Sequence, residues 1–139
     1  MKLVYGLSNE VAEWTCEKLG YCLAPPLIAI GVSDDDGEPL GGIVFNDWNG
    51  HNLEISIYGP GAMNRRTIDA AFHYAFQIAK ATRLTARTKR SNDWLKAMLP
   101  RLGFELEGVL HRYYGPGPHN DAFIYRLDPS AAKKWMTHG

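Results

Sequence analysis

The stretch YGPGAMNRR, residues 58–66, is the segment of the sequence that most constrains the fold and the function. It joins an alternating apolar run, Leu53–Tyr58, to a helical pattern that starts at about Asn64. Its glycines let the backbone approach a ligand closely, and the first N–H groups of a helix attract anions. Arg65 and Arg66 oppose the helix dipole at this end, which disfavours them by about 0.3–1 kcal/mol. A bound pyrophosphate would reverse that effect, whereas a plain turn with two solvated arginines is the alternative.

The pattern on either side of this junction predicts a mixed α/β domain of about seven strands flanked by helices. Apolar and β-branched runs bounded by turn residues indicate strands, and apolar residues at helical spacing indicate helices. The strands are expected at Leu27–Ser33, Leu40–Asn46, Leu53–Tyr58, Leu84–Thr88, Phe104–Leu110 and Ala122–Leu127, with Lys2–Tyr5 as an edge strand. The helices are expected at Ser8–Leu19, from about Asn64 to Ala81, from Ser91 to Pro100 and Gly103, and after Asp128.

Length, charge and cysteine content limit the class of protein. The chain has 139 residues, which fits one domain covering residues 1–139. Its 15 basic and 15 acidic residues balance, whereas non-specific nucleic-acid binding needs a net basic surface. Cys16 and Cys22 are too few and too close for a disulfide framework, so both are expected to be reduced, buried thiols. Without a signal peptide or an apolar run of about 20 residues, the protein is expected in the cytoplasm and away from membranes.

A second set of informative residues begins just after the strand expected at Leu84–Thr88. Asn92 comes first, and the next helix ends in Leu102-Gly103-Phe104, followed by Glu107-Gly108. In this order and spacing the sequence resembles the GNAT N-acetyltransferase superfamily. Within it, the sequence is similar to the branch of ribosomal-protein N-terminal acetyltransferases and their phage relatives. Asn120–Leu127 is similar to that family's last strand, and the resemblance covers roughly residues 27–127.

The resemblance implies both a fold and a co-substrate. The fold would be a mixed, mostly antiparallel sheet of about six to seven strands that splays between its fourth and fifth strands, flanked by helices. Acetyl-CoA would lie in this cleft, paired with the fourth strand and held at its pyrophosphate by the loop that follows. The cofactor-binding residues would be Ile55, Ser56, Ile57, Tyr58, Gly59, Gly61, Ala62, Met63, Asn64, Arg65, Arg66, Arg90 and Asn92. Arg87, Lys89 or Arg90 could contact the nucleotide phosphate, and the alternative is that these side chains are solvated charges.

Two departures from the family pattern bear on the reaction. The family's phosphate loop usually reads Gln or Arg, any two residues, Gly, any residue, and Gly or Ala. The matching stretch Gly61–Arg66 has no glycine after Asn64, although some phage-type relatives have a similar shortened loop followed by an arginine. The tyrosine that often acts as general acid in the family corresponds to Leu99, so this helix supplies no phenolic proton donor.

The implied reaction is direct attack of a primary amine, on a protein or a small molecule, on the acetyl thioester. Glu54 is the candidate general base, because strand alternation puts it on one face with Ser56 and Tyr58. A surface carboxylate paired with a basic neighbour is the alternative for Glu54. Tyr113 and Tyr114 are candidate donors of a proton to the leaving thiolate, with water as another. The candidates for the acceptor site are Trp48, His111 and Tyr114.

Other functions stay open beside acetyl transfer. His111, His119 and Asp121 do not follow a known ligand spacing, so no metal is expected. One rival is a non-catalytic domain that binds CoA or a protein partner. Another is a protein that binds or modifies nucleic acid, although the neutral net charge counts against it. The residues it would use are Arg83, Arg87, Lys89 and Arg90. Members of the family often dimerise, so the resemblance also implies a homodimer.

Overall fold

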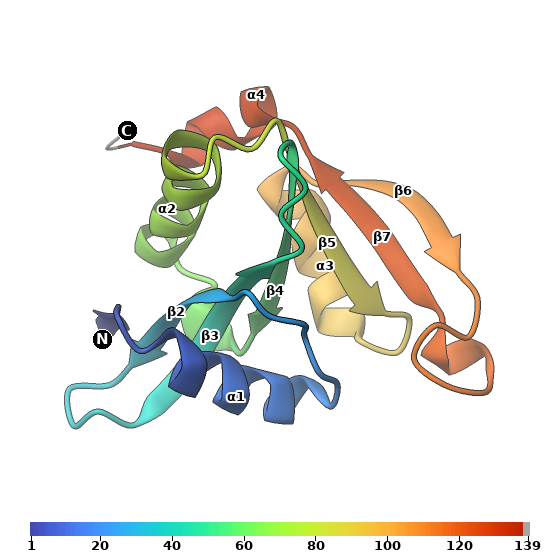
Figure 1. Ribbon diagram of the computed structural model, residues 1–139, viewed down its shortest axis with the longest axis horizontal. Coiled ribbons are helices and arrows are strands. Elements are labelled where there is room, and N and C mark those ends of the chain that lie inside the picture. Colours follow the sequence, from blue (N-terminus) through green and yellow to red (C-terminus); the bar gives the residue numbers. More distant parts are fainter. Residues whose placement is uncertain (138–139) are drawn as a thin grey trace.

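The computed structural model describes residues 1–137 and contains a seven-stranded sheet with helices on both faces (Figure 1). The strands are β1 (Lys2–Val4), β2 (Ile28–Ser33), β3 (Pro39–Asn46), β4 (Asn52–Tyr58), β5 (Arg83–Lys89), β6 (Glu105–Leu110) and β7 (Ala122–Leu127). The helices are α1 (Ser8–Leu19), α2 (Arg65–His73), α3 (Asp93–Leu102) and α4 (Pro129–Ala132). A π-helical turn at Tyr74–Ile78 continues α2, and 3-10 turns span Pro60–Ala62, Pro118–Asn120 and Lys133–Trp135. Every strand agrees with its predicted bounds to within one residue.

The strands follow the order β1-β2-β3-β4-β5-β7-β6 across the sheet. Neighbours pair antiparallel, except that β4 and β5 run parallel and are connected through α2. A parallel pair needs a crossover connection, and the long helical segment between β4 and β5 supplies it. The mixed, mostly antiparallel sheet expected from the sequence is therefore confirmed.

β4 and β5 pair over only part of their length. Four residue pairs join them, and the last pair is Ile55 with Ala86. Beyond this point β4 continues beside β3, and β5 continues beside β7, so the two strands diverge (Figure 1). We call the space between Ser56–Tyr58 of β4 and Arg87–Lys89 of β5 the β4–β5 gap. The splay predicted between the fourth and fifth strands is confirmed.

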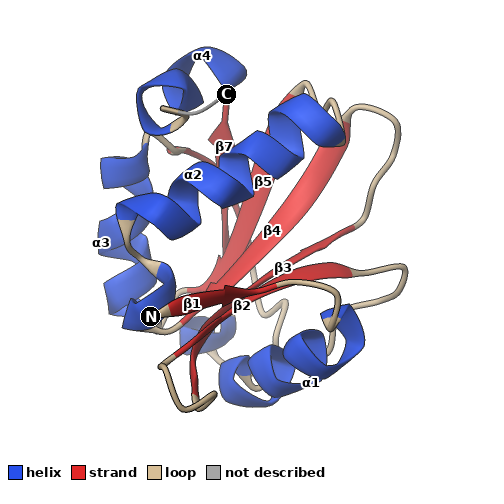
Figure 2. Ribbon diagram, turned by 90° about the vertical axis from the view of Figure 1, so that its left-hand side faces the viewer, coloured by secondary structure: helices blue, strands red, loops and turns tan. Residues whose placement is uncertain are grey.

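The larger part of the core lies between the sheet and the helices α2 and α3 (Figure 2). Phe72 of α2 is fully buried there, and its ring centroid lies 6.3 Å from that of Phe104. α2 begins where the Asn64 side chain accepts the N–H of Thr67 at 2.9 Å, which caps the helix. Burial of the apolar stripe of α2 thus fixes the helix on the sheet, and with it the loop that follows β4.

α1 covers the opposite face of the sheet through a smaller apolar cluster. That cluster consists of Ala12, Ala29 and Val44. Gly42 permits close approach of the helix, because a Cβ at this position would lie 2.0 Å from the Oγ1 of Thr15. The Trp14 ring meets the Tyr58 ring edge-on at 5.6 Å. Tyr58 therefore lies on the α1 side of the sheet, and Glu54, which shares its face of β4 by alternation, lies on that side too.

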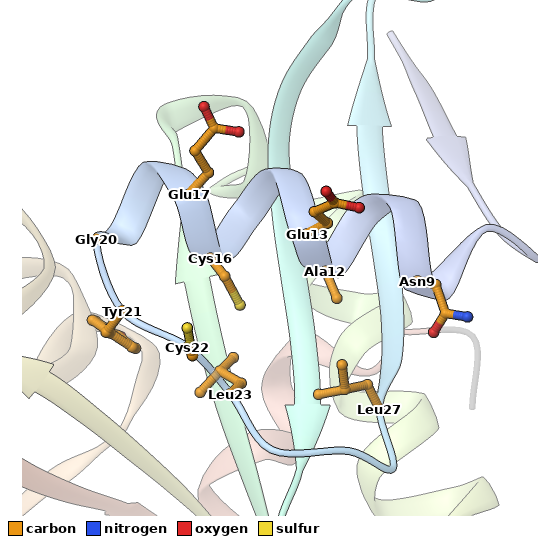
Figure 3. Close-up of a pocket in the computed structure, with 10 residues that line it drawn as sticks. All are labelled: Asn9, Ala12, Glu13, Cys16, Glu17, Gly20, Tyr21, Cys22, Leu23 and Leu27. Atoms are coloured by element: carbon orange, nitrogen blue, oxygen red, sulfur yellow. The ribbon is translucent and has the colours of Figure 1, made fainter.

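Two local expectations are corrected. Pro100 does not end α3, which continues to Leu102 and stops at Gly103 with a φ of 107°. A proline removes only its own N–H, and this late in the helix few further bonds depend on it. Cys22 is exposed and Cys16 only partly buried, because Gly20 ends α1 and the chain then runs extended along the helix. Figure 3 shows both thiols lining a cavity of about 500 Å³ beside α1.

Candidate active site

Glu54 lies on β4 at the inner end of the β4–β5 gap. Its residue is only 8% exposed, and its carboxylate pairs with the guanidinium of Arg87 on β5. Burial raises the pKa of the Glu54 carboxyl, Arg87 opposes this rise, and the negative charge of Asp47 adds to it. A carboxylate with a raised pKa in such a position can accept a proton from a bound amine.

Arg87 connects Glu54 to the segment between β6 and β7. One Nη of Arg87 donates to Glu54, and the other donates to the hydroxyl of Tyr113. The guanidinium also lies 4.8 Å from the centre of the Tyr113 ring. The structure thus brings together the two residues predicted to be catalytic, Glu54 and Tyr113, through an arginine for which the sequence suggested a phosphate or a nucleic acid.

Tyr21 and Tyr114 lie over the same face of the gap. Their rings stack with centroids 4.8 Å apart, and the Lys89 ammonium lies 5.8 Å from one ring and 5.6 Å from the other. The Tyr21 side chain also interacts with Ser56, the first β4 residue beyond the last pair with β5. Burial raises the pKa of both phenols, so both keep their protons at neutral pH.

Sequence reasoning did not identify Tyr21. It belongs to the connection between α1 and β2, whereas Tyr114 belongs to the connection between β6 and β7. Only the folded sheet brings these two distant connections together. The only local signal was an aromatic residue directly after Gly20, the glycine that ends α1, and such a residue more often just packs.

The loop from Gly59 to Arg66 leads from β4 through a short 3-10 turn into α2. Gly59 has a φ of 89°, and a Cβ there would lie 2.7 Å from the carbonyl oxygen of Leu40. A Cβ on Gly61 would lie 2.6 Å from the Cβ of Leu40. Close packing of the loop on β3 therefore accounts for both glycines, independently of any ligand. Asn64 completes the loop by donating to the carbonyl oxygen of Gly61 at 2.8 Å.

The side chains of the two arginines of this loop do not converge on one site. Arg65 donates to the carbonyl oxygen of Lys134 at 2.6 Å, and its guanidinium lies 5.2 Å from the Trp135 ring. Arg66 lines a cavity of about 410 Å³ beside β1, together with Tyr5. The N–H of Thr67 is taken by Asn64, so the N–H groups of Arg65 and Arg66 at the start of α2 are the part of the loop best suited to an anion.

Asn92 caps α3, because its Oδ1 accepts the N–H of Leu95 at 3.1 Å. The sequence pattern started this helix at Ser91, and the family resemblance assigned Asn92 to the cofactor. The Nδ2 of Asn92 donates no hydrogen bond within residues 1–137, so this group is free for a ligand while Oδ1 holds the helix.

Substitutions of Asn92 separate these two roles. Asn92→Ala is expected to lower the free energy of unfolding by about 1 kcal/mol, because α3 loses its cap. Asn92→Asp keeps an acceptor for the Leu95 N–H and is expected to keep that stability, but it removes the Nδ2 donor. Urea denaturation measures the cap, and calorimetric titration with acetyl-CoA measures any contact of Nδ2. Ser91→Ala is the matched control, and equal destabilisation by Asn92→Asp and Asn92→Ala would contradict the capping role.

The other predicted site residues lie in three different places. Leu99 is fully buried in α3, so this helix supplies no hydroxyl to the gap. Trp48 lines an apolar cavity of about 310 Å³ near the start of β4, together with Tyr74. His111 lies against Asp121 in the connection between β6 and β7. Of the three residues predicted for the acceptor, the structure therefore brings only Tyr114 to the polar face of the gap.

Three of the four basic residues named for nucleic-acid contact are paired with carboxylates within the protein, Arg90 through Asp121 at 3.3 Å. Arg83 donates to Glu107 at 2.6 Å and to Asn52 at 3.1 Å, and Arg87 is paired with Glu54. The described part of the chain contains no group of three His, Cys, Asp or Glu side chains placed to hold a metal ion. Within residues 1–137, no helix has both the length and the apolar character to cross a membrane.

A mostly antiparallel sheet that splays beside its parallel pair, with α1 on one face and α2 and α3 on the other, is the GNAT fold. A variant of the spermidine N-acetyltransferase of Vibrio cholerae matches 93% of this chain with 78% of its own, at a TM-score of 0.64 and 19% identity. The ribosomal-protein-S5-alanine acetyltransferase of Vibrio fischeri matches 87% with 68% of its own chain (TM-score 0.60, 17% identity). A nourseothricin acetyltransferase matches 75% with 66% of its own chain (TM-score 0.64, 18% identity).

Comparison of the sequence with protein families and curated proteins identifies no relative. No family model matches the sequence, and no curated protein is similar enough in sequence to count as a match. At identities below 25% the similarity is one of fold.

Proposed function

We propose that this protein is an N-acetyltransferase that moves an acetyl group from acetyl-CoA to a primary amine by direct attack. The observation that carries the proposal is the buried Glu54 at the inner end of the β4–β5 gap, on a fold shared with N-acetyltransferases. The three structural neighbours carry spermidine, ribosomal-protein-S5-alanine and nourseothricin in their names. These names differ widely, so the proposal extends only to the class of acceptor, a primary amine.

The residues around the gap fit acetyl-CoA. Beyond Ile55, the edge of β4 that faces β5 has no strand partner among the described residues, so its backbone can pair with the amides of the pantetheine arm. The N-terminus of α2 follows directly and suits the pyrophosphate. When bound, acetyl-CoA supplies an activated acetyl thioester, which an amine can attack without a covalent intermediate on the protein.

The protein's own groups handle the protons. Glu54 accepts the proton that the attacking amine loses, directly or through a water molecule, and Arg87 holds the carboxylate in place. We place the proton donor to the leaving thiolate among the tyrosines of this face. Tyr113 and Tyr114 are the predicted candidates, and Tyr21, which stacks on Tyr114 and interacts with Ser56, is a third. Because their pKa values are raised, the phenols of Tyr21 and Tyr114 stay protonated at neutral pH and can each donate a proton.

Titration with acetyl-CoA tests the proposal. A ligand present at 100 times its dissociation constant adds about 2.7 kcal/mol to the free energy of unfolding, so the thermal midpoint should rise by several degrees. Acetyl transfer to a panel of amines, followed by release of free thiol, is the accompanying assay. Absence of a thermal shift at millimolar acetyl-CoA would rule out the transferase.

A non-catalytic CoA-binding domain is the second candidate. Two observations favour it: Leu99 provides no hydroxyl where the family often has a tyrosine, and the Glu54 carboxylate is already paired with Arg87. This candidate predicts the same thermal shift with acetyl-CoA but no release of thiol with any amine in the panel. The two candidates are therefore separated by the thiol assay alone.

A further inference from the structure

A pocket of about 320 Å³ lies between the end of β5 and the connection from β6 to β7. These two segments lie at the lower right of Figure 1. Its lining residues are Arg90, His111, Arg112, Gly117, Pro118 and Asp121. Three of these side chains are basic and one is acidic, although the chain as a whole has no net charge. The pocket therefore concentrates positive charge in a concave site.

Asp121 organises this pocket. Its side chain is only 3% exposed, and its Oδ1 accepts the backbone N–H of Arg112 at 2.9 Å. Its Oδ2 lies 3.3 Å from Nη1 of Arg90 and 3.3 Å from Nδ1 of His111. The backbone adds a further link, because the Arg90 N–H donates to the Asp121 carbonyl oxygen at 2.8 Å. One buried carboxylate thus sets the positions of all three basic residues.

The basic groups keep donors free for a ligand. Asp121 takes one nitrogen of Arg90 and one of His111, which leaves the rest of the guanidinium and Nε2 of the imidazole unbonded within the described residues. The side chains of these two residues are 51% and 74% exposed. Arg112 has no carboxylate partner for its side chain within residues 1–137, and its backbone is held in the left-handed region at a φ of 55°. Arginine guanidinium groups recognise phosphate and carboxylate oxygens through pairs of N–H donors.

The pocket lies next to the β4–β5 gap on both segments that line it, the end of β5 and the connection from β6 to β7. Arg90 directly follows Lys89, the last residue of β5, and Arg112 directly precedes Tyr113 and Tyr114. The pocket and the gap are therefore neighbours at the end of β5, which is the placement a single elongated ligand would need to occupy both.

We propose that the pocket of Arg90, His111 and Arg112 binds an anionic oxygen group, a phosphate or a carboxylate, of a molecule that also occupies the gap. The inference rests on the proposed function for the identity of that molecule. The anion has two sources with the same chemistry: the 3′-phosphate of the CoA nucleotide, or an anionic group on the amine acceptor.

Titration with inorganic phosphate at constant ionic strength tests the pocket without any enzymatic activity. The His111 ring resonances, identified by their absence in His111→Gln, are expected to shift saturably in the wild type. Arg112→Gln is expected to raise the dissociation constant about tenfold or more, because it removes a charge-assisted pair of donors. Arg101→Gln, an exposed arginine of α3, is the matched control and is expected to titrate like the wild type. Identical titrations for Arg112→Gln and Arg101→Gln, or no saturable shift in the wild type, would overturn the proposal.

Two further comparisons identify the source of the anion. Calorimetry compares acetyl-CoA with acetyl-dephospho-CoA, which lacks only the 3′-phosphate, and kinetics compare 3-aminopropyl phosphate with propylamine. If the nucleotide is the source of the anion, the wild type binds acetyl-CoA more tightly than acetyl-dephospho-CoA, and Arg112→Gln binds the two equally. If the acceptor is the source, the wild type acetylates 3-aminopropyl phosphate faster than propylamine, and Arg112→Gln acetylates the two at similar rates. A wild type that shows neither preference would overturn a role beside the gap. A wild type that binds phosphate but transfers no acetyl group would refute the proposed function and leave the pocket intact.

Discussion

Replacing Glu54 with glutamine is expected to lower kcat for acetyl transfer by about 10²–10⁴-fold, the usual contribution of a general base. The substitution keeps the shape of the side chain and an oxygen that can accept from Arg87, but it removes the basic carboxylate. The rate of thiol release from acetyl-CoA at saturating amine measures the effect. Glu38→Gln, an exposed glutamate of the β2–β3 turn, is the matched control and is expected to leave kcat unchanged.

The pH dependence gives this prediction a second readout. The reaction needs the ionised form of Glu54, so kcat should fall as the pH drops through its pKa. Because burial raises that pKa, the fall is expected at a higher pH than for an ordinary glutamate, and it should vanish in Glu54→Gln. An unchanged acid limb in the variant would remove Glu54 as the base.

The same pKa shift predicts how stability responds. A carboxyl whose pKa is raised by folding favours the folded state fully at a pH below its unfolded value, and this contribution is lost as the pH rises through the folded value. At neutral pH the ionised Glu54 is therefore a net cost to the fold. Glu54→Gln should unfold no more easily than the wild type there, so a loss of activity would not be a loss of structure.

Gly59→Ala is expected to lower the free energy of unfolding by about 2–5 kcal/mol. Roughly 1–2 kcal/mol comes from the left-handed backbone, and about 1–3 kcal/mol from forcing a Cβ against the backbone of Leu40. Gly37→Ala isolates the first contribution, because Gly37 has a φ of 86° but nothing within 4 Å of the added Cβ. Chemical denaturation of the two variants gives the steric part by difference.

This pair of variants also tests why the loop contains glycines. If packing on β3 is the reason, Gly59→Ala destabilises the protein without any ligand, and clearly more than Gly37→Ala. If the glycine instead served a ligand, the two variants would be equally stable and only Gly59→Ala would bind acetyl-CoA less tightly.

The strands and the splay could be predicted because their signals are local or carried by family resemblance. Alternation around Ile55 and turn residues between runs define each strand to within one residue. The contacts of single side chains depend instead on which distant segments meet. The sequence gives no local sign that Tyr21 reaches Tyr114, or that Arg65 turns to the carbonyl of Lys134 and away from the gap.

Asn92 shows a third kind of limit. Its place in the pattern is recognisable, but one amide carries two groups, and the sequence does not say which of them is engaged. The structure commits Oδ1 to the first turn of α3 and leaves Nδ2 uncommitted. A residue predicted for a ligand and a residue needed by the fold can therefore be the same residue, through different atoms.

The partial pairing of β4 and β5 has a mechanical consequence. Four residue pairs are all that join the half-sheet β1–β4 to the half-sheet β5–β7–β6 through the backbone ladder. At the open end of that short ladder, Glu54, which belongs to its third residue pair, forms an ion pair with Arg87 of β5. The proposed base thus also links the two halves of the sheet where they begin to diverge, so the carboxylate that would take the proton also helps to hold the halves together.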